Sequence, residues 1–431
     1  MIQQYQESTV QGPFDPLAVV AQLTGSGMLG EYVVYERGGR WRVAGDALAE
    51  VRVDARHVRT GDGEALEWSG TPWRQVAEAL ERTPVADWRA YGWACFELAA
   101  PDLPADDQVL AHLVVPRLEF EITADRVLVR AVDPGELDAA LKLVAEPGAR
   151  PGHQPVPVDI RADPTTYHCG VSHTVAEIGR GRLEKAIVSR PVPVPFRVDL
   201  CATYLTGRRH NTPARSFLLD LGGWQAAGFS PETVVETDTS GRVSTQPLAG
   251  TRALTGDPGT DEALRAELLT DPKEVYEHAA SVRLAVEELT SVGRPGSTHV
   301  TEFMTVKRRG SVQHLASRVA TTLAEGRTGW DALGAVFPPV TASGIPKAAA
   351  YRLIAELEDQ PRGLYAGTVL MADADGSLDA ALVLRAVYQR DGRAWLRAGA
   401  GVVAGSRPAR EYEETCEKLA AVAPYVVPAD H

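Results

Sequence analysis

Two pairs of glutamates at helical spacing are the residues whose arrangement points most directly to chemistry. Glu411 and Glu414 lie three positions apart and Lys418 follows four positions later, so all three side chains project from one face of a helix. Glu274 and Glu277 repeat this spacing in a second helical segment. Four carboxylates on two facing helices would bind a hard cation such as Mg²⁺, which prefers oxygen ligands. A solvated helix face is the alternative explanation for each pair, because spacing alone does not show that the helices meet.

Two cations in strand-like segments are further candidates. Arg385 lies in the mostly apolar run 378–389, where a buried guanidinium needs a carboxylate partner from the protein or from a substrate. Tyr365 begins the neighbouring predicted strand and would supply a hydroxyl to the same anion. Lys185 begins a β-branched segment. It is either a catalytic lysine on a buried strand face or an exposed lysine that protects a sheet edge.

Two glycine-containing stretches would let a ligand approach the backbone. Gly250 precedes Thr251, and Gly399 is followed by a second glycine, Gly401. Tight packing or a β-bulge is the alternative explanation for such glycines. The histidines, His314 among them, form no metal-binding pattern. No nucleophile elbow, P-loop or dinucleotide-binding glycine pattern is present, so serine hydrolases, nucleotide hydrolases and dinucleotide oxidoreductases lose support.

The amino-acid composition and charge exclude some classes of binding partner. The chain has 431 residues and a formal net charge of −13, with 44 Lys and Arg against 57 Asp and Glu and no polybasic run, so nucleic acid is not an expected partner. An anionic substrate would need a local cation or a metal ion. The first residues lack a secretory pattern and no apolar run is long enough to span a membrane, which predicts a cytoplasmic protein with no membrane partner. Four scattered cysteines are expected to be reduced thiols.

Hydrophobic periodicity predicts the elements that must position these residues. In the first part of the chain we expect a hairpin over 28–60, helices over 72–86, 88–100 and 136–144, and strands over 109–121 and 126–132. In the second part we expect helices over 164–178 and 272–288, and a helix with Ser406 as N-cap that runs to Ala421. Strands are expected over 185–194, 216–221, 233–237 and 242–245. A three-stranded antiparallel meander is predicted over 365–372, 378–389 and 394–403.

The domain prediction is one enzyme domain over 1–431. A stretch rich in proline and glycine, 147–158, separates a structural N-terminal part, 1–150, from a catalytic part, 151–431, that carries the chemical motifs.

Taken in order, the motif-bearing segments resemble the chorismate-utilising enzymes, which include anthranilate, aminodeoxychorismate, isochorismate and salicylate synthases. The matching segments are 247–252, 273–278, 343–347, 362–367, 379–385, 399–401 and 411–418. Within the family, segments 207–218 and 303–314 are most similar to the salicylate synthases of siderophore pathways, such as the mycobactin pathway.

The resemblance implies a fold, an activity and a set of partners. The implied fold is α/β of the α+β type, one large layered body of two similar halves with antiparallel sheets and outer helices, and with the active site between the halves. The implied activity isomerises chorismate to isochorismate and then eliminates pyruvate to leave salicylate, with Mg²⁺ as cofactor. A monomer or homodimer without a glutaminase subunit is expected.

The resemblance also assigns roles to residues. Lys185 is implied as the general base that activates water, and Glu232 as the general acid that protonates the departing ring hydroxyl. The implied Mg²⁺ ligands, direct or through water, are Glu274, Glu277, Glu411 and Glu414. The implied substrate-binding residues are Gly250, Thr251, His314, Tyr365, Arg385, Gly399 and Lys418.

Three functions other than salicylate synthesis also remain possible from the sequence. An isochorismate synthase that stops after isomerisation shares nearly all of these residues. An anthranilate or aminodeoxychorismate synthase component would use ammonia, but anthranilate synthases generally lack the lysine that stands here at Lys185. A non-catalytic chorismate-binding relative would not need a paired acid and base. Lys185 also needs a lowered pKa to act as a base at neutral pH, and nearby carboxylates oppose this unless Mg²⁺ cancels their charge.

Overall fold

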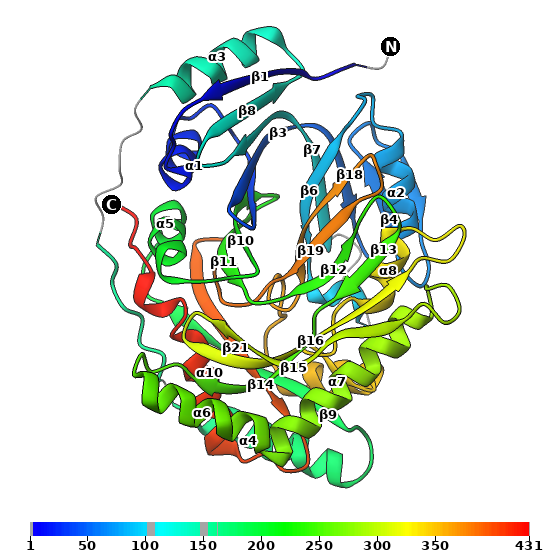
Figure 1. Cartoon of the computed structure of the whole chain (residues 1–431), viewed down its shortest axis with the longest axis vertical. Coiled ribbons are helices and arrows are strands. Elements are labelled where there is room, and N and C mark those ends of the chain that lie inside the picture. Colours follow the sequence, from blue (N-terminus) through cyan, green and yellow to red (C-terminus); the bar gives the residue numbers. More distant parts are fainter. Residues whose placement is uncertain (1–2, 101–107, 147–153, 162, 431) are drawn as a thin grey trace.

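The structure is a computed structural model, and it describes residues 3–100, 108–146, 154–161 and 163–430. In the described residues, antiparallel strands form one continuous 21-stranded sheet (Figure 1). It branches at one long strand, β7 (Ala111–Ile122), and the two branches are called here the first and the second sheet. In order of pairing, the first sheet contains β1 (Gln6–Gln11), β8 (Arg126–Ala131), β7 (Ala111–Ile122), β3 (Arg40–Val53), β2 (Tyr32–Arg37), β10 (Arg215–Leu221), β11 (Trp224–Ser230), β20 (Ala386–Arg390), β21 (Arg393–Val402), β9 (Lys185–Val194) and β17 (Gly344–Ile345). A hairpin of β4 (His57–Thr60) and β5 (Ala65–Glu67) continues from β3.

The second sheet also starts from β7. Its strands, in order of pairing, are β6 (Arg89–Ala94), β18 (Thr368–Asp373), β19 (Leu378–Leu382), β12 (Thr233–Thr237), β13 (Arg242–Thr245) and β16 (Val312–Thr322), which also pairs with β14 (Leu248–Ala253) and β15 (His299–Arg309). β6 and β8 pair with successive stretches of one edge of β7, while β3 pairs with its other edge. The two sheets therefore diverge from β7. Among the connections that cross between them are β11 to β12, called here the first crossing, and β19 to β20, called here the second crossing.

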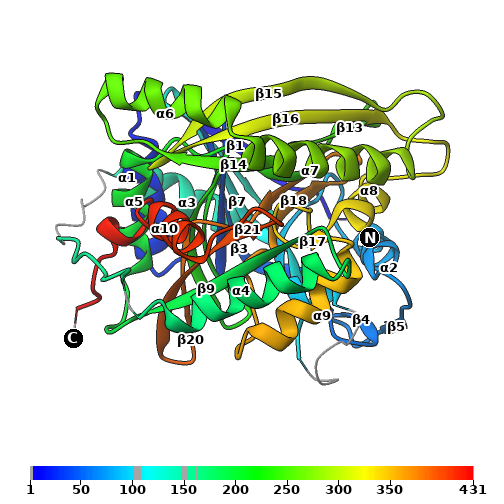
Figure 2. The ribbon, with the colours of Figure 1, turned by 90° about the horizontal axis from the view of Figure 1, so that it is seen from below.

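Helices cover the outer faces of both sheets, as the predicted α+β class requires. They are α1 (Pro16–Gly25), α2 (Trp73–Glu81), α3 (Pro134–Ala145), α4 (Thr165–Gly179), α5 (Leu200–His210), α6 (Pro258–Thr270), α7 (Pro272–Thr290), α8 (Gly329–Val336), α9 (Lys347–Leu357) and α10 (Pro408–Leu419), with 3₁₀ turns at Phe96–Ala99 and Ala423–Tyr425. Figure 2 shows α6 and α7 against β14 and β16, and α4 and α9 against β9 on the opposite side of the molecule. α10 lies between these layers and packs on β21 and α4.

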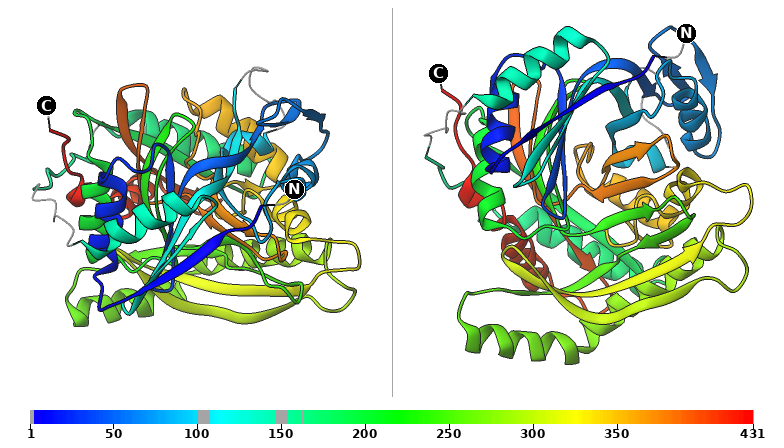
Figure 3. Two further views of the ribbon diagram at one scale, coloured as in Figure 1. Left: turned by 90° about the horizontal axis from the view of Figure 1, so that it is seen from above. Right: turned by 45° about the horizontal axis from the view of Figure 1, so that its top comes forward.

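Central strands such as β10 are buried on both faces. In β10, Phe217 and Leu219 belong to one hydrophobic cluster and Leu218 to the other, because alternate side chains of a strand point to opposite faces. Such strands appear in the sequence as continuous apolar runs rather than as alternating patterns. The long hairpin of β15 and β16 runs along one margin of the molecule (Figure 3).

Two sequence predictions of secondary structure are wrong. The segment 88–100 is the strand β6 followed by a 3₁₀ turn, not a helix. β6 is buried between β7 and β18, so its apolar residues reflect burial on two faces and not helical periodicity. The predicted strand 378–389 is two strands, β19 and β20, which pair with different sheets, so there is no three-stranded meander. The break lies at Arg385, whose φ of 52° is a left-handed backbone conformation.

The remaining elements named in the sequence predictions are present at nearly the predicted positions. The proposed linker 147–158 lies partly outside the described residues. The division into 1–150 and 151–431 stays a prediction. Among the described residues, no helix combines the length and apolarity needed to cross a membrane.

Candidate active site

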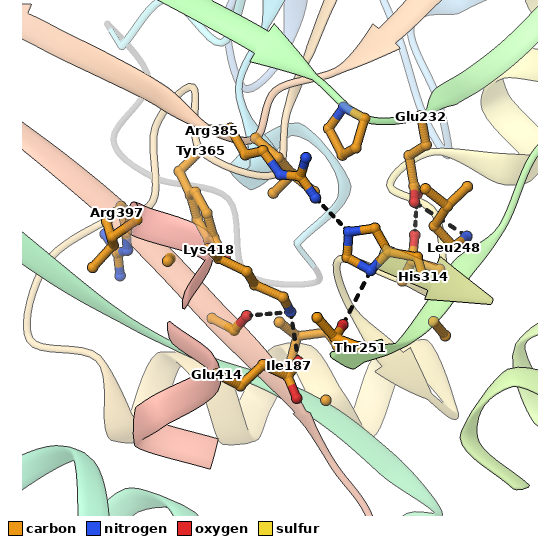
Figure 4. Close-up of a pocket in the computed structure, with 18 of the residues that line it drawn as sticks. Ile187, Glu232, Leu248, Thr251, His314, Tyr365, Arg385, Arg397, Glu414 and Lys418 are labelled. Atoms are coloured by element: carbon orange, nitrogen blue, oxygen red, sulfur yellow. Dashed lines mark hydrogen bonds and ion pairs between the residues drawn. The ribbon is translucent and has the colours of Figure 1, made fainter. Parts of the chain in front are cut away.

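A pocket lies between the two sheets, at the first and second crossings (Figure 4). The crossings are held together by the Ser230 hydroxyl, which donates to the Leu382 carbonyl, and by the Phe229 amide, which donates to the Arg385 carbonyl. Among the residues that line the pocket are Ile187, Glu232, Gly250, Thr251, Glu277, His314, Thr341, Tyr365, Arg385, Arg397, Gly399, Glu414 and Lys418. Strands of both sheets and α10 therefore contribute to one cavity, which is where the resemblance places the active site.

The four predicted metal-binding glutamates lie together, from α7 on one side and α10 on the other. Their side chains are buried, so neither pair belongs to a solvated helix face. α7 begins at Pro272, and its N-cap Asp271 accepts hydrogen bonds from the amides of Lys273 and Glu274. This cap fixes the first turn of α7 and with it the direction of Glu274.

Lys273 lies at the centre of this glutamate cluster. Its Nζ is 3.4 Å from Glu274 Oε1, 3.4 Å from Glu277 Oε2 and 3.4 Å from Glu411 Oε1. Glu414 Oε1 instead accepts from Lys418 Nζ at 2.8 Å. Three carboxylates thus share the Lys273 ammonium, although Glu277 also pairs with Lys185 and Glu274 with Arg252, each at 2.9 Å.

The electrostatics of the glutamate cluster favour the binding of additional positive charge. Burial and the neighbouring Glu414 raise the pKa of Glu411 to about 7, and the same two causes raise the pKa of Glu274. The Oε2 atoms of Glu411 and Glu414 are buried and have no hydrogen-bond partner among the described residues. Hard oxygen donors with unpartnered atoms are chemically suited to Mg²⁺. The carboxylates are nonetheless spread around the ammonium, and no three His, Cys, Asp or Glu side chains of the described chain are grouped as ligands of one ion.

Lys185 is buried at the start of β9, with 1% of its surface exposed, so it is not an exposed edge lysine. Its Nζ donates to Ser281 Oγ at 3.0 Å and forms an ion pair with Glu277 Oε1 at 2.9 Å. Both partners are on α7, which therefore holds Lys185 behind the Glu277 carboxylate. The Glu277 carboxylate lines the pocket and Lys185 does not, among the described residues.

Glu232 follows β11, at the first crossing between the sheets, and is 2% exposed. Its Oε2 accepts from the Leu248 amide at 3.2 Å and its Oε1 accepts from the Thr341 hydroxyl. Burial raises the pKa of Glu232 to about 8, although these hydrogen bonds and the charges of Lys185 and Lys418 act in the opposite direction. At neutral pH most of this carboxyl is therefore protonated and able to give up a proton.

Arg385 is buried at the second crossing and makes no ion pair with any described carboxylate. One of its Nη atoms donates to the Arg309 carbonyl at 2.7 Å, and the other donates to Nε2 of His314. Nδ1 of His314 then carries the ring hydrogen and donates to Thr251 Oγ1 at 3.1 Å. Figure 4 shows this chain of contacts on one side of the pocket.

The charges along this chain are consistent with an anion site. Burial and the adjacent Arg309 lower the pKa of Arg385 to about 9, so its guanidinium remains charged at neutral pH. Burial and Arg385 lower the pKa of His314 well below its usual value, so the imidazole is neutral. A buried cation without a carboxylate partner in the described protein favours the alternative in which a substrate supplies the carboxylate.

Tyr365 and Lys418 lie on the opposite wall from His314 (Figure 4). Tyr365 is 2% exposed, and its ring lies near the guanidinium groups of Arg362 and Arg397, each 5.6 Å from the ring centre. Lys418 Nζ donates to the Gly399 carbonyl at 2.9 Å as well as to Glu414. Hydroxyl and ammonium donors therefore converge on the pocket from this side.

Two glycines are required by close contacts in the site. A Cβ on Gly401 would lie 2.0 Å from Glu277 Oε1, so only glycine leaves room for that carboxylate. Gly250 has a φ of 82°, which favours glycine, and a Cβ there would lie 3.3 Å from the Glu274 side chain. Both glycines thus admit the metal-binding candidates of α7.

Comparison with known proteins identifies the family. Residues 31–424 match the model of the chorismate binding enzymes. The chain belongs to this family. It is 44% identical over 407 residues to the salicylate synthase of Mycolicibacterium paratuberculosis, covering 92% of this chain and 90% of that protein. It is 34% identical over 394 residues to anthranilate synthase component 1 of Thermus thermophilus, covering 85% and 84%.

Solved structures of family members share the fold. Anthranilate synthase component I of Streptococcus pneumoniae superposes with a TM-score of 0.77 at 24% identity, over 90% of this chain and 92% of that one. MenF, the menaquinone-specific isochorismate synthase of Escherichia coli, gives a TM-score of 0.75 at 22% identity, over 98% and 95%. The predicted layered α+β fold of the chorismate-binding family is confirmed.

The structure brings every predicted site residue of this family member to the pocket or to the glutamate cluster beside it. It also adds residues that the sequence did not indicate: Thr341, Ser281 and Lys273. Ser281 follows Glu277 by four positions, and Lys273 directly precedes Glu274, so helical spacing would have placed both beside the glutamates. Thr341 is far from Glu232 in the sequence, and no local pattern connects them.

Proposed function

We propose that this chorismate-binding enzyme is a salicylate synthase. It would convert chorismate to isochorismate and then to salicylate and pyruvate, with Mg²⁺ as cofactor. The observation that carries the proposal is a buried carboxylic acid, Glu232, that lines the pocket, together with a buried lysine, Lys185, that contacts the pocket-lining carboxylate of Glu277. The 44% identity to the salicylate synthase of M. paratuberculosis supports the choice of product.

The first half-reaction replaces one hydroxyl of the ring by another. Lys185 would act as the base that takes a proton from a water molecule, whose oxygen adds to the ring carbon beside the one that bears the carboxylate. The ring double bonds shift, and the hydroxyl at C4 leaves as water with the proton of Glu232. One water is consumed and one is released, so the step is an isomerisation. Lys185 ends protonated and Glu232 ionised, and proton exchange with solvent restores both.

The second half-reaction removes the enolpyruvyl group. The ether bond to ring carbon C3 breaks and its oxygen leaves with pyruvate. The hydrogen at C2 is lost from the ring, which becomes aromatic, and the CH₂ carbon of the enolpyruvyl group gains a hydrogen to become the methyl group of pyruvate. Salicylate therefore keeps the hydroxyl that was added in the first half-reaction. In this step the pocket residues orient the substrate.

A substrate with two carboxylates needs cations on a protein of net charge −13. Arg385 and Tyr365 would hold the enolpyruvyl carboxylate, with His314 and the backbone of Gly250, Thr251 and Gly399 beside it. Lys418 would lie near the ring carboxylate. Bound by Glu274, Glu277, Glu411 and Glu414, directly or through water, Mg²⁺ would neutralise the ring carboxylate and fix its position.

Replacing Arg385 by glutamine should raise the KM for chorismate by roughly 10- to 100-fold, the cost of one charge-assisted hydrogen bond to a carboxylate. Steady-state kinetics with and without the substitution measure this change. Arg390→Gln is the matched control, because Arg390 is on β20 near Arg385 and does not line the pocket in the described structure. An unchanged KM for Arg385→Gln would contradict the role of Arg385.

Replacing Glu277 by glutamine should raise the Mg²⁺ concentration for half-maximal activity by about tenfold or more, or abolish activity, because a charged metal ligand is lost. Glu287→Gln, an exposed glutamate on the same helix α7, should leave the magnesium titration unchanged. If Glu277→Gln titrated like the parent enzyme, the assignment of the metal ligands would be wrong.

The proposal is tested by incubating the purified protein with chorismate, with and without Mg²⁺, and separating the products by chromatography. Salicylate and pyruvate that require Mg²⁺ are the expected products. Isochorismate alone would indicate an isochorismate synthase, and a product that requires ammonium would indicate an anthranilate or aminodeoxychorismate synthase. Unchanged chorismate under all conditions would favour a non-catalytic binding protein.

The wider context of the reaction follows from the same proposal. Water rather than ammonia is the nucleophile, so a monomer or homodimer without a glutaminase subunit suffices. Salicylate would provide the aryl cap of a siderophore or a related natural product made in the cytoplasm.

A further inference from the structure

Two cavities border the glutamate cluster from opposite sides. The pocket between the sheets is lined by Glu277 and Glu414. A second, open cavity of about 1010 Å³ is lined by Lys273, Glu274 and Glu411. The four glutamates therefore form a partition between the proposed substrate pocket and this outer cavity, and Lys273 reaches into the partition from the outer side.

The position of Lys273 differs from that of the other lysines in the site. Lys185 and Lys418 make direct ion pairs with one glutamate each, at 2.9 Å and 2.8 Å. Lys273 Nζ is instead 3.4 Å from three carboxylates on two helices, with no shorter contact to any of them. An ammonium that is equidistant from three carboxylates lies at a position where one cation can interact with all three.

A divalent ion and this ammonium cannot occupy the cluster together. Mg²⁺ holds its oxygen ligands at about 2.0–2.1 Å, so carboxylates now spread around Lys273 would have to converge on the metal. Two cations a few ångströms apart in a buried site repel strongly. The ammonium must therefore leave before the metal can take these ligands.

We propose that Lys273 occupies the cation position of the metal-free enzyme and withdraws into the outer cavity when Mg²⁺ binds. The inference rests on the proposed metal site and deepens it. The outer cavity has space for the side chain, and the carboxylates of Glu184, Glu267 and Asp271 line it, paired with Arg283 and Arg252. The withdrawn ammonium would share these carboxylates with the arginines.

This exchange has a thermodynamic consequence. Lys273 stabilises the metal-free fold, because without it three buried carboxylates would face one another with less compensation. The same contacts weaken metal binding, because only molecules with Lys273 withdrawn are competent to bind the ion. Lys273 therefore sets the Mg²⁺ concentration at which the site fills.

Lys273→Met tests the proposal in the full-length protein without substrate. We expect Mg²⁺ to bind the variant at least about tenfold more tightly than the parent in isothermal titration calorimetry, because the competing state is removed. The metal-free variant should unfold at a lower temperature than the parent, and Mg²⁺ should restore its stability. A variant that is unfolded without metal should regain its circular dichroism spectrum when Mg²⁺ is added.

Arg410→Met is the matched control for a general change of charge. Arg410 also lies near the cluster and lines the outer cavity, but its guanidinium pairs with Glu417 at 2.7 Å. Removing it should tighten Mg²⁺ binding much less than removing Lys273. An equal increase in Mg²⁺ affinity in both variants would show a general effect of removing positive charge and would overturn the proposal. A Lys273→Met protein with parental or weaker Mg²⁺ affinity would also overturn it. The same holds if no Mg²⁺ concentration refolds the variant.

The binding measurements are separable from the proposed function. A parent protein that binds Mg²⁺ but forms no salicylate would contradict the synthase assignment and leave the role of Lys273 standing. Normal salicylate formation together with unchanged Mg²⁺ affinity in Lys273→Met would contradict only the role of Lys273.

Discussion

Lys185→Ala is expected to lower chorismate turnover by about 10²–10⁴-fold, the usual contribution of a general base, while supplied isochorismate is still converted to salicylate. The substitution should affect the two substrates differently because only the first half-reaction requires activation of water. Product formation from each substrate, followed by chromatography, measures the two half-reactions separately. Circular dichroism checks the fold, since the substitution removes an ion-pair partner of buried Glu277.

Lys185→Arg distinguishes the base from the charge. Arginine retains a positive charge for Glu277 but does not deprotonate in proteins, so this variant should also lose chorismate turnover. Ser281→Ala removes the hydrogen bond from Lys185 and the one that the Ser281 hydroxyl donates to the Glu277 carbonyl, but it keeps the lysine. It should reduce the rate far less than either substitution of the lysine. Turnover of chorismate by Lys185→Arg at the parental rate would rule out the base assignment.

Glu232→Gln should reduce chorismate turnover by a similar factor, about 10²–10⁴, because glutamine cannot protonate the departing hydroxyl. In the parent enzyme the pKa of Glu232 is raised to about 8, and the acid is active only when protonated. The rate of isochorismate formation should therefore fall as pH rises through about 8. In Glu232→Gln the residual rate should lack this alkaline limb.

Thr341→Val is a separate test of whether Glu232 causes the loss of activity at alkaline pH, because it should shift the pH at which that loss occurs in a known direction. The Thr341 hydroxyl donates to Glu232 and lowers its pKa, so its removal should move the alkaline limb of the parent profile to higher pH while activity is retained. An alkaline limb that stays in place in Thr341→Val, or persists in Glu232→Gln, would show that another group titrates.

The elements that carry the site were predictable from sequence because each is set by local patterns. α7 and α10 follow from glutamates at helical spacing on apolar-faced segments, and β9 from its β-branched residues. That the two helices meet at one cluster was not predictable from their spacing. The contact depends on the packing of α10 against β21 and of α7 against β14, which are long-range interactions.

The errors and omissions have the same physical origin. β6 was predicted as part of a helix because its burial between two strands removes the alternation that marks a half-buried strand. The break at Arg385 depends on a left-handed backbone conformation that a non-glycine residue adopts where the chain crosses between sheets. Glu232 was identified only through the family resemblance, since its partners Thr341 and Leu248 come from elsewhere in the chain.

Conversion of chorismate in buffer prepared with H₂¹⁸O and Mg²⁺ tests the central claim most directly. If water adds to the ring and pyruvate then leaves with the ether oxygen, mass spectrometry should show one ¹⁸O atom in the hydroxyl of salicylate. Salicylate with an unlabelled hydroxyl, or no salicylate at all, would contradict the proposed synthase.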